Sequence, residues 1–378
     1  MRTRIVPALC ALSLFILTGI LIGQQQGPIG SPGSTVAKPR NKSADPDKKE
    51  EPSEAPKIPS QYKKDKAQQT PTTTFTTDVD IVTVDVAVMD NKGHFIPGIP
   101  AGNFRVLEDN VPQQVKAMTN SEAPLTLAIV IEFSNKFQRL YGRTWFQTLQ
   151  LAWGFASTLK PTDFVAVVAY DMRPEILTDF TTDRSKTQEA LGRLTIPAFS
   201  EANLYDALTD TADRMSAIEG RKAILLIASG IDTFSKITYD QARKKLQESA
   251  VPVYIVGLMQ ALREMMDQYM SGPARMDFLQ ADNAMRTFAK ETGGQAYFPR
   301  FEGEYGAIFQ SIHEALRNQY VLTYQPTNKA HDGTFRKIKV ELVNPATNEP
   351  LAVKDEKGKP VKYTIVAKNG YKAPRAVE

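Results

Sequence analysis

The chain has 378 residues, of which 46 are lysine or arginine and 42 are aspartate or glutamate, so its formal net charge is +4. A charge this close to balance gives no reason to expect a nucleic-acid partner. Cys10 is the only cysteine, which excludes an internal disulfide, and its removal on export would leave no thiol for catalysis or zinc binding.

The first residues have the order of a secretory signal. Arg2 and Arg4 precede an apolar stretch, residues 5–23, and three glutamines follow it. We therefore expect residues 1–23 to be a signal peptide that directs the chain to the periplasm or the cell surface. The stretch is also near the shortest length that spans a bilayer, about 17 residues, so an uncleaved membrane anchor is the alternative.

Residues 24–73 are rich in Pro, Ser, Lys, Gln and Glu and contain almost no aromatic or branched aliphatic residues. Such a segment cannot bury enough apolar surface to offset the entropy lost on ordering. We expect a disordered linker here. The rest of the chain is long enough for two domains.

Strand patterns occur near both ends of this remaining part. The segments before the middle are residues 79–88, 104–108 and 113–118, and those after it are residues 318–324, 335–343 and 362–367. Neither group alone supplies enough strands for an independently stable sheet. We therefore expect residues 74–122 and 318–378 to pair into one β-sandwich that the middle part interrupts.

The middle part, residues 123–317, alternates strand and helix patterns. Expected strands are residues 125–132, 164–170, 175–177, 223–228, 252–258 and 295–298, and expected helices are residues 145–159, 184–194, 204–218, 239–249, part of 276–292, and 303–317. This alternation predicts an α/β fold with a doubly wound, mostly parallel sheet covered by helices on both faces. Ligands bind such sheets at the carboxyl ends of the strands, so the polar loops after residues 132 and 228 bear most on function.

The middle part resembles a von Willebrand factor type A (VWA) domain, a Rossmann-like α/β fold. With its flanks, from about residue 74 to 374, the chain resembles VWA-related bacterial proteins that are common in acidobacteria. The matching stretches are residues 79–90, 103–114, 204–208 (Leu-Tyr-Asp-Ala-Leu), 224–233, 251–258, 291–294 (Glu-Thr-Gly-Gly), 319–326, 332–338 and 370–374. The resemblance implies a domain used for binding and not for covalent chemistry.

The family pattern also implies a metal-ion-dependent adhesion site with oxygen ligands for magnesium or manganese: Asp-x-Ser-x-Ser after the first strand, a later Thr, and an Asp after the fourth strand. The first motif here has Glu132 for the Asp, keeps Ser134, continues with Asn135, and has Lys136 for the last Ser. The departure makes the site degenerate.

The two later positions depart from the pattern as well. The Thr position falls on Ala202 or Asn203, and Ser229 stands where the second Asp is expected. We therefore favour no metal, with Glu132, Ser134 and Asp232 as residual candidate ligands.

Lys136 is the main obstacle to a metal. At an effective dielectric near 20, two unit charges about 4 Å apart interact by roughly 4 kcal/mol, and a divalent ion doubles this repulsion. One hypothesis is that the Lys136 ammonium takes the cation position and pairs with Glu132 and Asp232. The alternative is that Lys136 points into solvent while Glu132 caps a helix.

Other clusters have ordinary explanations. Asp206 and Asp210 are spaced to share a helix face, and we expect them to interact with the helix dipole. The methionine-rich segment 260–276 is expected to pack on its own domain, with a contact surface for a partner as the alternative. Helical spacing assigns three apolar residues of the first helix to the core: Trp145, Leu149 and Trp153.

These observations predict an exported, non-catalytic module that binds an unknown protein partner through loops at the carboxyl edge of the sheet. The alternatives are adhesion through magnesium or manganese at the residual site, and an enzyme acting on envelope polymers. For an enzyme, the histidines His94, His313 and His331 each lack a ligand-spaced partner in the sequence. The predicted binding edge consists of Glu132, Ser134, Asn135, Lys136, Asn203, Ser229 and Asp232.

Overall fold

The computed structural model describes residues 80–120, 123–135, 144–195, 199–354 and 359–375. All of these belong to a single structural unit. The predicted signal peptide or anchor (1–23), the predicted linker (24–73) and Lys136 lie outside the described residues. None of the helices in the described ranges is long and apolar enough to span a bilayer.

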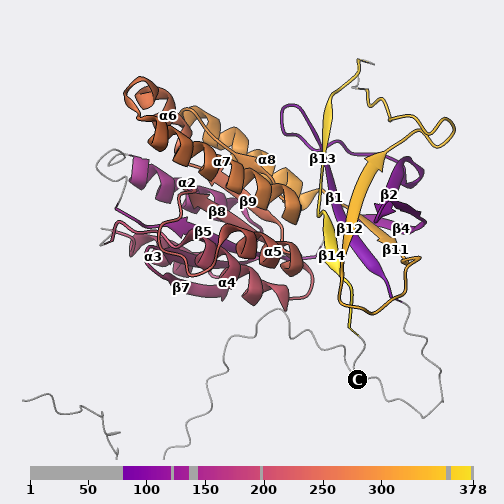
Figure 1. The fold of residues 1–378 in the computed structure, drawn as a ribbon, viewed down its shortest axis with the longest axis horizontal. Coiled ribbons are helices and arrows are strands. Elements are labelled where there is room, and N and C mark those ends of the chain that lie inside the picture. The colour runs from indigo at the N-terminus through magenta and orange to yellow at the C-terminus, as the bar shows by residue number, and fades with distance from the viewer. Residues whose placement is uncertain (1–79, 121–122, 136–143, 196–198, 355–358, 376–378) are drawn as a thin grey trace, which may run out of the picture. The chain divides into compact units, whose positions relative to one another are not determined.

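A six-stranded sheet forms the centre of the α/β part (Figure 1). Its strands are all parallel to their neighbours except the last, which runs antiparallel to the strand beside it. The predicted mostly parallel sheet is therefore confirmed. In order across the sheet, the strands are β10 (Ala296–Tyr297), β9 (Val253–Gly257), β8 (Arg221–Ala228), β5 (Leu125–Glu132), β6 (Phe164–Tyr170) and β7 (Pro174–Thr181).

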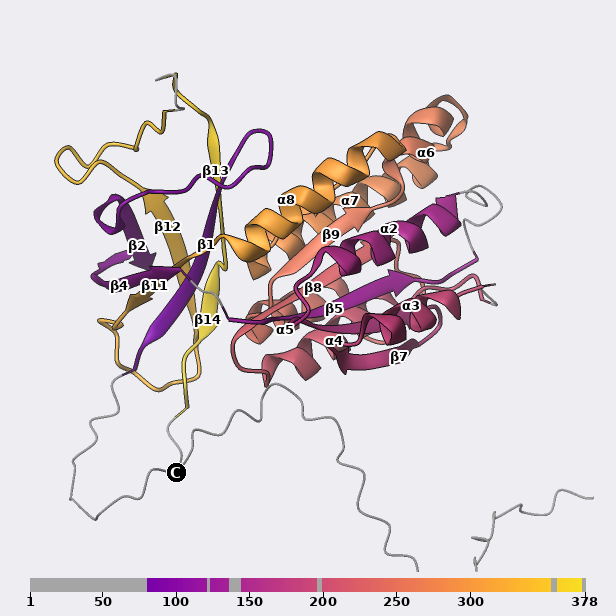
Figure 2. The same ribbon diagram turned by 180° about the vertical axis from the view of Figure 1, so that it is seen from behind.

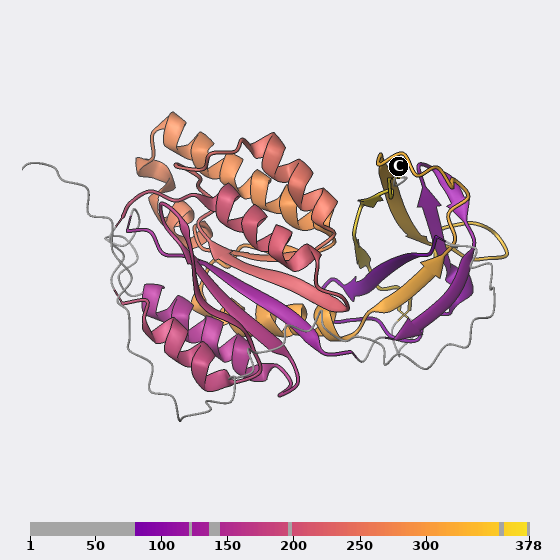
Figure 3. The same cartoon turned by 90° about the horizontal axis from the view of Figure 1, so that it is seen from below.

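Helices cover both faces of this sheet, as Figure 3 shows. Leu127 and Ile129 of β5 face one helical layer, and Ala128 and Val130 face the other. Successive strand residues point to opposite faces, and helices cover both faces, so every residue of β5 is buried. This accounts for its continuous aliphatic sequence. The first layer contains α2 (Thr144–Thr158), α3 (Arg184–Gly192) and α8 (Tyr305–Arg317), and the second contains α4 (Leu204–Ser216), α5 (Tyr239–Ser249) and α7 (Gly272–Thr292).

The segment after β9 differs from the prediction. It forms a short helix, α6 (Gln260–Met266), and a 3-10 turn (Asp267–Tyr269), and α7 then begins at Gly272. The Ser271 hydroxyl caps α7 by accepting a hydrogen bond from the Ala274 N–H at 3.4 Å. The expectation that the methionines of segment 260–276 pack on the domain is wrong for Met265, which is 64% exposed, and for Met276, which is 54% exposed.

The packing prediction for the first helix is confirmed for two residues. Leu149 and Trp153 of α2 pack against the buried cluster under the first helical layer. The side chain of Trp145 lies outside the described residues.

Two four-stranded antiparallel sheets are built from the segments that flank the α/β part (Figure 2). Each sheet combines strands from before and after that part, and the inner faces of both contribute to one buried cluster that includes Val84, Val106 and Leu322. The strand orders are β13 (Tyr363–Ala367), β1 (Val82–Asp90), β11 (Tyr320–Tyr324), β4 (Val115–Asn120) for one sheet, and β14 (Gly370–Lys372), β12 (Phe335–Leu342), β2 (Phe104–Glu108), β3 (Val111–Gln113) for the other.

A buried ion pair joins the amino ends of β5 and β6 to the end of α8. The Asp163 carboxylate accepts hydrogen bonds from the N–H groups of Leu125 at 2.9 Å and Lys160 at 2.8 Å, and it pairs with both terminal nitrogens of Arg317. Burial by itself would raise the pKa of Asp163, but Arg317 and the two N–H donors outweigh it, so the pKa is lowered.

Candidate functional site

The candidate site lies where β5 and β8 end. These are the two adjacent central strands, and the chain continues from β5 to β6 and β7 on one side and from β8 to β9 and β10 on the other. The loops that follow β5 and β8 therefore lead in opposite directions across the sheet. A crevice between the first residues of two such loops is the usual ligand position in this type of sheet. The strand order therefore places residues 133–135 and 229–238 at the expected ligand position.

The Glu132 carboxylate connects the two loops. It is 7% exposed. One oxygen, Oε1, accepts a hydrogen bond from the Ser134 hydroxyl at 2.8 Å, and the other, Oε2, accepts one from the buried Ser229 N–H at 2.7 Å. Hydrogen bonds to an ionised carboxylate are among the stronger ones in proteins, so this side chain fixes the β8 loop against the end of β5.

Asp232 holds the β8 loop on the amino end of α4. Its Oδ1 accepts hydrogen bonds from the Ser235 hydroxyl at 2.5 Å and the Tyr205 N–H at 3.2 Å. Asp206, in the first turn of α4, accepts in return from the Lys236 N–H at 2.9 Å. The loop thereby satisfies helix N–H groups that have no partner inside the helix. Burial raises the pKa of Asp232, and the bonds from Ser235 and Tyr205 offset part of the rise.

Asn203 and Ser229 lie below the surface, each 3% exposed. The Asn203 Nδ2 donates to the Met172 carbonyl at 2.9 Å, and its N–H donates to the Asp171 carbonyl at 2.8 Å. The Ser229 hydroxyl accepts from the Ile231 N–H at 3.2 Å. Both residues, like Glu132, are placed to position the loops and not to contact a partner directly.

Sequence reasoning missed Tyr170, the last residue of β6. It is 1% exposed and lies close enough to Glu132 and Asp232 for both carboxylates to add to the rise in its pKa, which burial causes in the first place. Its position at a strand end is the only signal for it in the sequence. Burial and both carboxylates thus all favour the neutral phenol.

Two exposed aromatic side chains were also missed. Phe199 is 46% exposed and Phe234 is 49% exposed. The Phe199 carbonyl accepts a hydrogen bond from the Asn135 N–H at 2.7 Å, and the Phe234 N–H donates to the Ala202 carbonyl at 3.1 Å. The backbone of each is therefore fixed while its ring faces solvent, and a lone Phe within a polar loop is the signal that could have indicated them.

The described residues at this edge do not fit a divalent cation. Such an ion needs several oxygen ligands directed at one point. Both carboxylate oxygens of Glu132 accept hydrogen bonds from the β5 and β8 loops, Asp232 is bound to Ser235 and Tyr205, and Ser229 supplies no carboxylate. Within the described ranges, no group of three or more His, Cys, Asp or Glu side chains could hold a metal.

The histidines lie away from this edge, His313 on α8 and the other two in loops of the flanking segments. The His94 Nδ1 is 3.5 Å from an Asp90 oxygen, and the His331 Nε2 is 2.5 Å from an Asp80 oxygen. Burial, together with the neighbouring Arg317, lowers the pKa of His313 on α8.

Comparison with known proteins gives weak likenesses. No family model matches the chain, and no curated protein matches it. Among solved structures, the BatB protein from Bacteroides thetaiotaomicron has 16% identity and a TM-score of 0.40, with 50% of this chain and 98% of that chain covered. The type A protein from Catenulispora acidiphila has 12% identity and a TM-score of 0.42, with 79% and 75% covered.

The vWF domain of the type V pili tip protein Mfa5 from Porphyromonas gingivalis has 12% identity and a TM-score of 0.39, with 52% of this chain and 97% of that chain covered. Values this low assign neither fold nor function. The description of the α/β part therefore rests on the strand order and contacts of the chain itself.

Proposed function

We propose that the chain is an exported, non-catalytic binding module of the VWA type, which meets a protein partner at the carboxyl edge of its six-stranded sheet. Its α/β domain comprises residues 123–317, and the flanking residues 74–122 and 318–378 form the β-sandwich that carries it. The sequence motifs and the strand order, with the switch point between β5 and β8, support the domain type.

The observation that carries the proposal is the Glu132 bridge between the β5 and β8 loops. A buried carboxylate that is bonded to both loops holds them in one arrangement, so little ordering is needed when a partner binds. The rings of Phe199 and Phe234 then project from loops whose backbones are fixed. Aromatic side chains on a rigid frame are the usual anchors of protein interfaces.

The competing proposal is adhesion through magnesium or manganese at a residual site. It needs an ion held near Glu132 and Ser134 despite Lys136. Replacing Lys136 with serine and titrating each metal during thermal unfolding separates the two: our proposal expects no metal-dependent rise in melting temperature for wild type or variant.

Capture of partners from envelope extract by the immobilised protein tests the proposal directly. We expect a captured protein to be lost when Phe199 and Phe234 are both changed to serine. The matched control is Val111→Ser, which replaces another exposed apolar residue, 50% exposed, on β3. Capture should survive in the control and in the presence of a chelator.

Three results would contradict the proposal. If the Phe199 and Phe234 double variant still captured the partner, the binding surface would lie outside the carboxyl edge of the sheet. Loss of the partner on chelation would favour the metal-dependent version. Release of soluble fragments from envelope polymers by the purified protein would favour the enzyme.

A further inference from the structure

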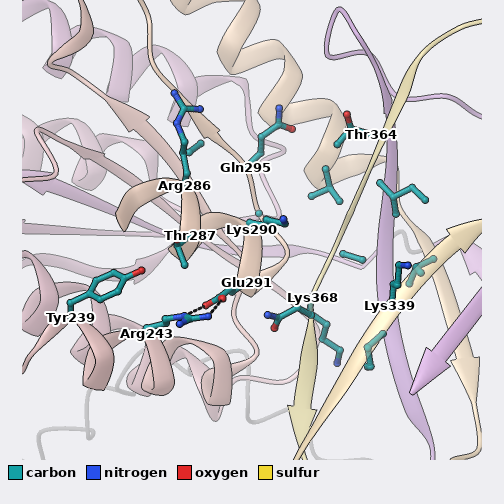
Figure 4. Close-up of a pocket in the computed structure, with 18 residues that line it drawn as sticks. Tyr239, Arg243, Arg286, Thr287, Lys290, Glu291, Gln295, Lys339, Thr364 and Lys368 are labelled. Carbon is teal, nitrogen blue, oxygen red and sulfur yellow. Dashed lines mark hydrogen bonds and ion pairs between the residues drawn. The ribbon is translucent and has the colours of Figure 1, made fainter. Parts of the chain in front are cut away.

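A cleft of about 770 Å³ lies between helices α5 and α7 and strands β12 and β13 (Figure 4). A second cleft of about 870 Å³ adjoins it, so the two form one trough; the residues that line both are Arg243, Glu291, Ile338, Lys339 and Asn369. Figure 4 shows Arg286 and Lys290 of α7 on one side and Thr364 and Lys368 on the other. The trough uses neither the β5 nor the β8 loop.

The lining of the first cleft carries an excess of positive charge. It has five basic side chains (Arg243, Arg286, Lys290, Lys339 and Lys368) and one acidic side chain, Glu291. The cleft therefore favours a ligand that brings negative charge.

Glu291 does not offset the remaining charge. Its carboxylate accepts a hydrogen bond from the Arg243 Nε at 2.7 Å and another from the Gln247 Nε2 at 2.9 Å. Its negative charge is matched by the Arg243 guanidinium, and the dashed lines of Figure 4 join these two side chains.

Among the described residues, three cations of the lining lack an ion pair, and one of them, Arg286, also contacts the Phe298 ring, whose centroid lies 4.0 Å from its Cζ. In the part of the chain that the structure describes, no carboxylate forms an ion pair with Arg286, Lys290 or Lys368. Arg286 and Lys290 are four residues apart on α7 and so share a helix face. Burial lowers the pKa of Lys368 and the nearby Asp85 offsets part of the fall, so a further anion beside Lys368 would also favour its charged form.

The edge of a sheet borders the same cleft. Residues 364–367 of β13 contribute to its lining, and β13 is the outermost strand of its sheet, paired with β1 on one side only. The backbone N–H and C=O groups on the open side of an edge strand can pair with an added strand. The cleft thus offers main-chain hydrogen bonds along the β13 wall and positive charge from both walls, with Arg286 and Lys290 on one and Lys368 on the other.

We propose that this cleft binds an extended acidic segment of a partner protein, which adds as a strand along β13 with its carboxylates toward Arg286, Lys290 and Lys368. The five residues of β13 match a segment of similar length. A single-stranded nucleic acid fits less well, because it needs stacking surfaces and Tyr239 is the one aromatic side chain among the described residues of the lining. This second surface goes beyond the proposed function and does not depend on it.

The test measures fluorescence anisotropy of labelled peptides with the full chain. The probe is a peptide of about ten residues that alternates Glu and Thr, long enough to cover β13. One comparison peptide has Lys in place of Glu, and another has the Thr amide nitrogens methylated, which removes hydrogen-bond donors but keeps the charge. We expect the acidic peptide to bind, the basic one not to bind, and the methylated one to bind at least about tenfold more weakly.

Charge-removing variants locate the site. Lys290→Gln and Lys368→Gln should each weaken binding of the acidic peptide by about tenfold, a loss typical of one charge-assisted contact. Lys186→Gln is the matched control, because Lys186 is an exposed lysine on α3 in the other helical layer. Lys290 is exposed, so its variant keeps the test valid even if Lys368→Gln unfolds.

Equal binding of the methylated and unmethylated acidic peptides would overturn strand addition. Unchanged binding in Lys290→Gln would overturn the location. Dextran sulfate serves as a non-peptide polyanion. If it binds more tightly than the acidic peptide, and if the lysine variants weaken its binding equally, the ligand is a non-peptide polyanion and the proposed peptide is wrong. The Phe199 and Phe234 double variant should bind the peptide like wild type, so failure here is separable from failure of the carboxyl-edge proposal.

Discussion

Replacing Glu132 with alanine removes the carboxylate that joins the β5 and β8 loops. The buried Ser229 N–H then loses the acceptor that lies 2.7 Å away. An N–H left without a partner in the interior costs about 1–3 kcal/mol. The lost buried methylene adds about 0.8 kcal/mol. The half-buried Ser134 hydroxyl can turn to water and adds little, so we expect the free energy of unfolding to fall by about 2–4 kcal/mol.

Urea unfolding followed by tryptophan fluorescence measures this loss, because Trp153 packs against the core of the α/β part. Two variants serve as controls. Glu132→Gln keeps an oxygen for the Ser229 N–H and an amide that can donate to Ser134, so it should lose only about 1 kcal/mol. Ser134→Ala removes only the half-buried hydrogen bond and should lose less than about 1 kcal/mol.

Equal stability of Glu132→Ala and Ser134→Ala would show that the bond to the Ser229 N–H does not stabilise the loops, and would refute the reasoning. A second refuting result is a magnesium-dependent gain in stability that wild type shows and Glu132→Ala lacks. The carboxylate would then act as a metal ligand.

Asp163→Asn should lower the free energy of unfolding by about 3–5 kcal/mol, because it leaves the buried Arg317 without its anion, and urea unfolding measures this. The pKa of Asp163 is lowered in the folded state, so its ionised carboxylate stabilises the fold fully above its unfolded-state pKa of about 3.9. This stabilisation is lost as the pH falls from there through the folded-state pKa. Below about pH 4, the free energy of unfolding should therefore fall less steeply with decreasing pH in the variant than in wild type. Gly293→Ala should lower the free energy of unfolding by more than about 1 kcal/mol. Gly293 has a φ of +85°, and an added Cβ would lie 2.4 Å from the backbone nitrogen of Lys368. Gly154→Ala, inside α2 with nothing within 4 Å of an added Cβ, should instead raise the melting temperature.

Much of the α/β part could be predicted from local pattern. The bounds of β5, β6 and α5 agree with the expected ranges 125–132, 164–170 and 239–249. Continuous aliphatic runs of seven or eight residues, rich in β-branched side chains, indicate buried strands by their length and composition. The Thr238 capping box marks the start of α5.

The parts that were missed have weaker local signals. The edge strand β7 is longer than the expected residues 175–177, because it is only half-buried and its polar residues hide the alternation. α6 was not expected, since its sequence of methionine and polar residues has no clear periodicity and only Leu262 in it is buried.

The candidate site could be located but not constructed from sequence. The positions of Glu132, Asn203 and Ser229 follow from motif spacing, but their roles depend on contacts between residues far apart. The bond from the Ser229 N–H to Glu132 spans 97 positions. The cleft beside β13 joins α7 to a strand from the end of the chain, a neighbourhood that no local pattern encodes.

The way the α/β part is inserted also bears on how the protein responds to mechanical load. The chain leaves the antiparallel sheet at the end of β4 and returns to it at the start of β11, and these strands are paired, with Asn120 opposite Tyr320. Tension applied along the flanking segments is therefore transmitted across the β4–β11 ladder. We therefore expect the inserted part to bear no stretching force until that ladder separates, so that the loops at the carboxyl ends of β5 and β8 keep their arrangement while the chain is pulled.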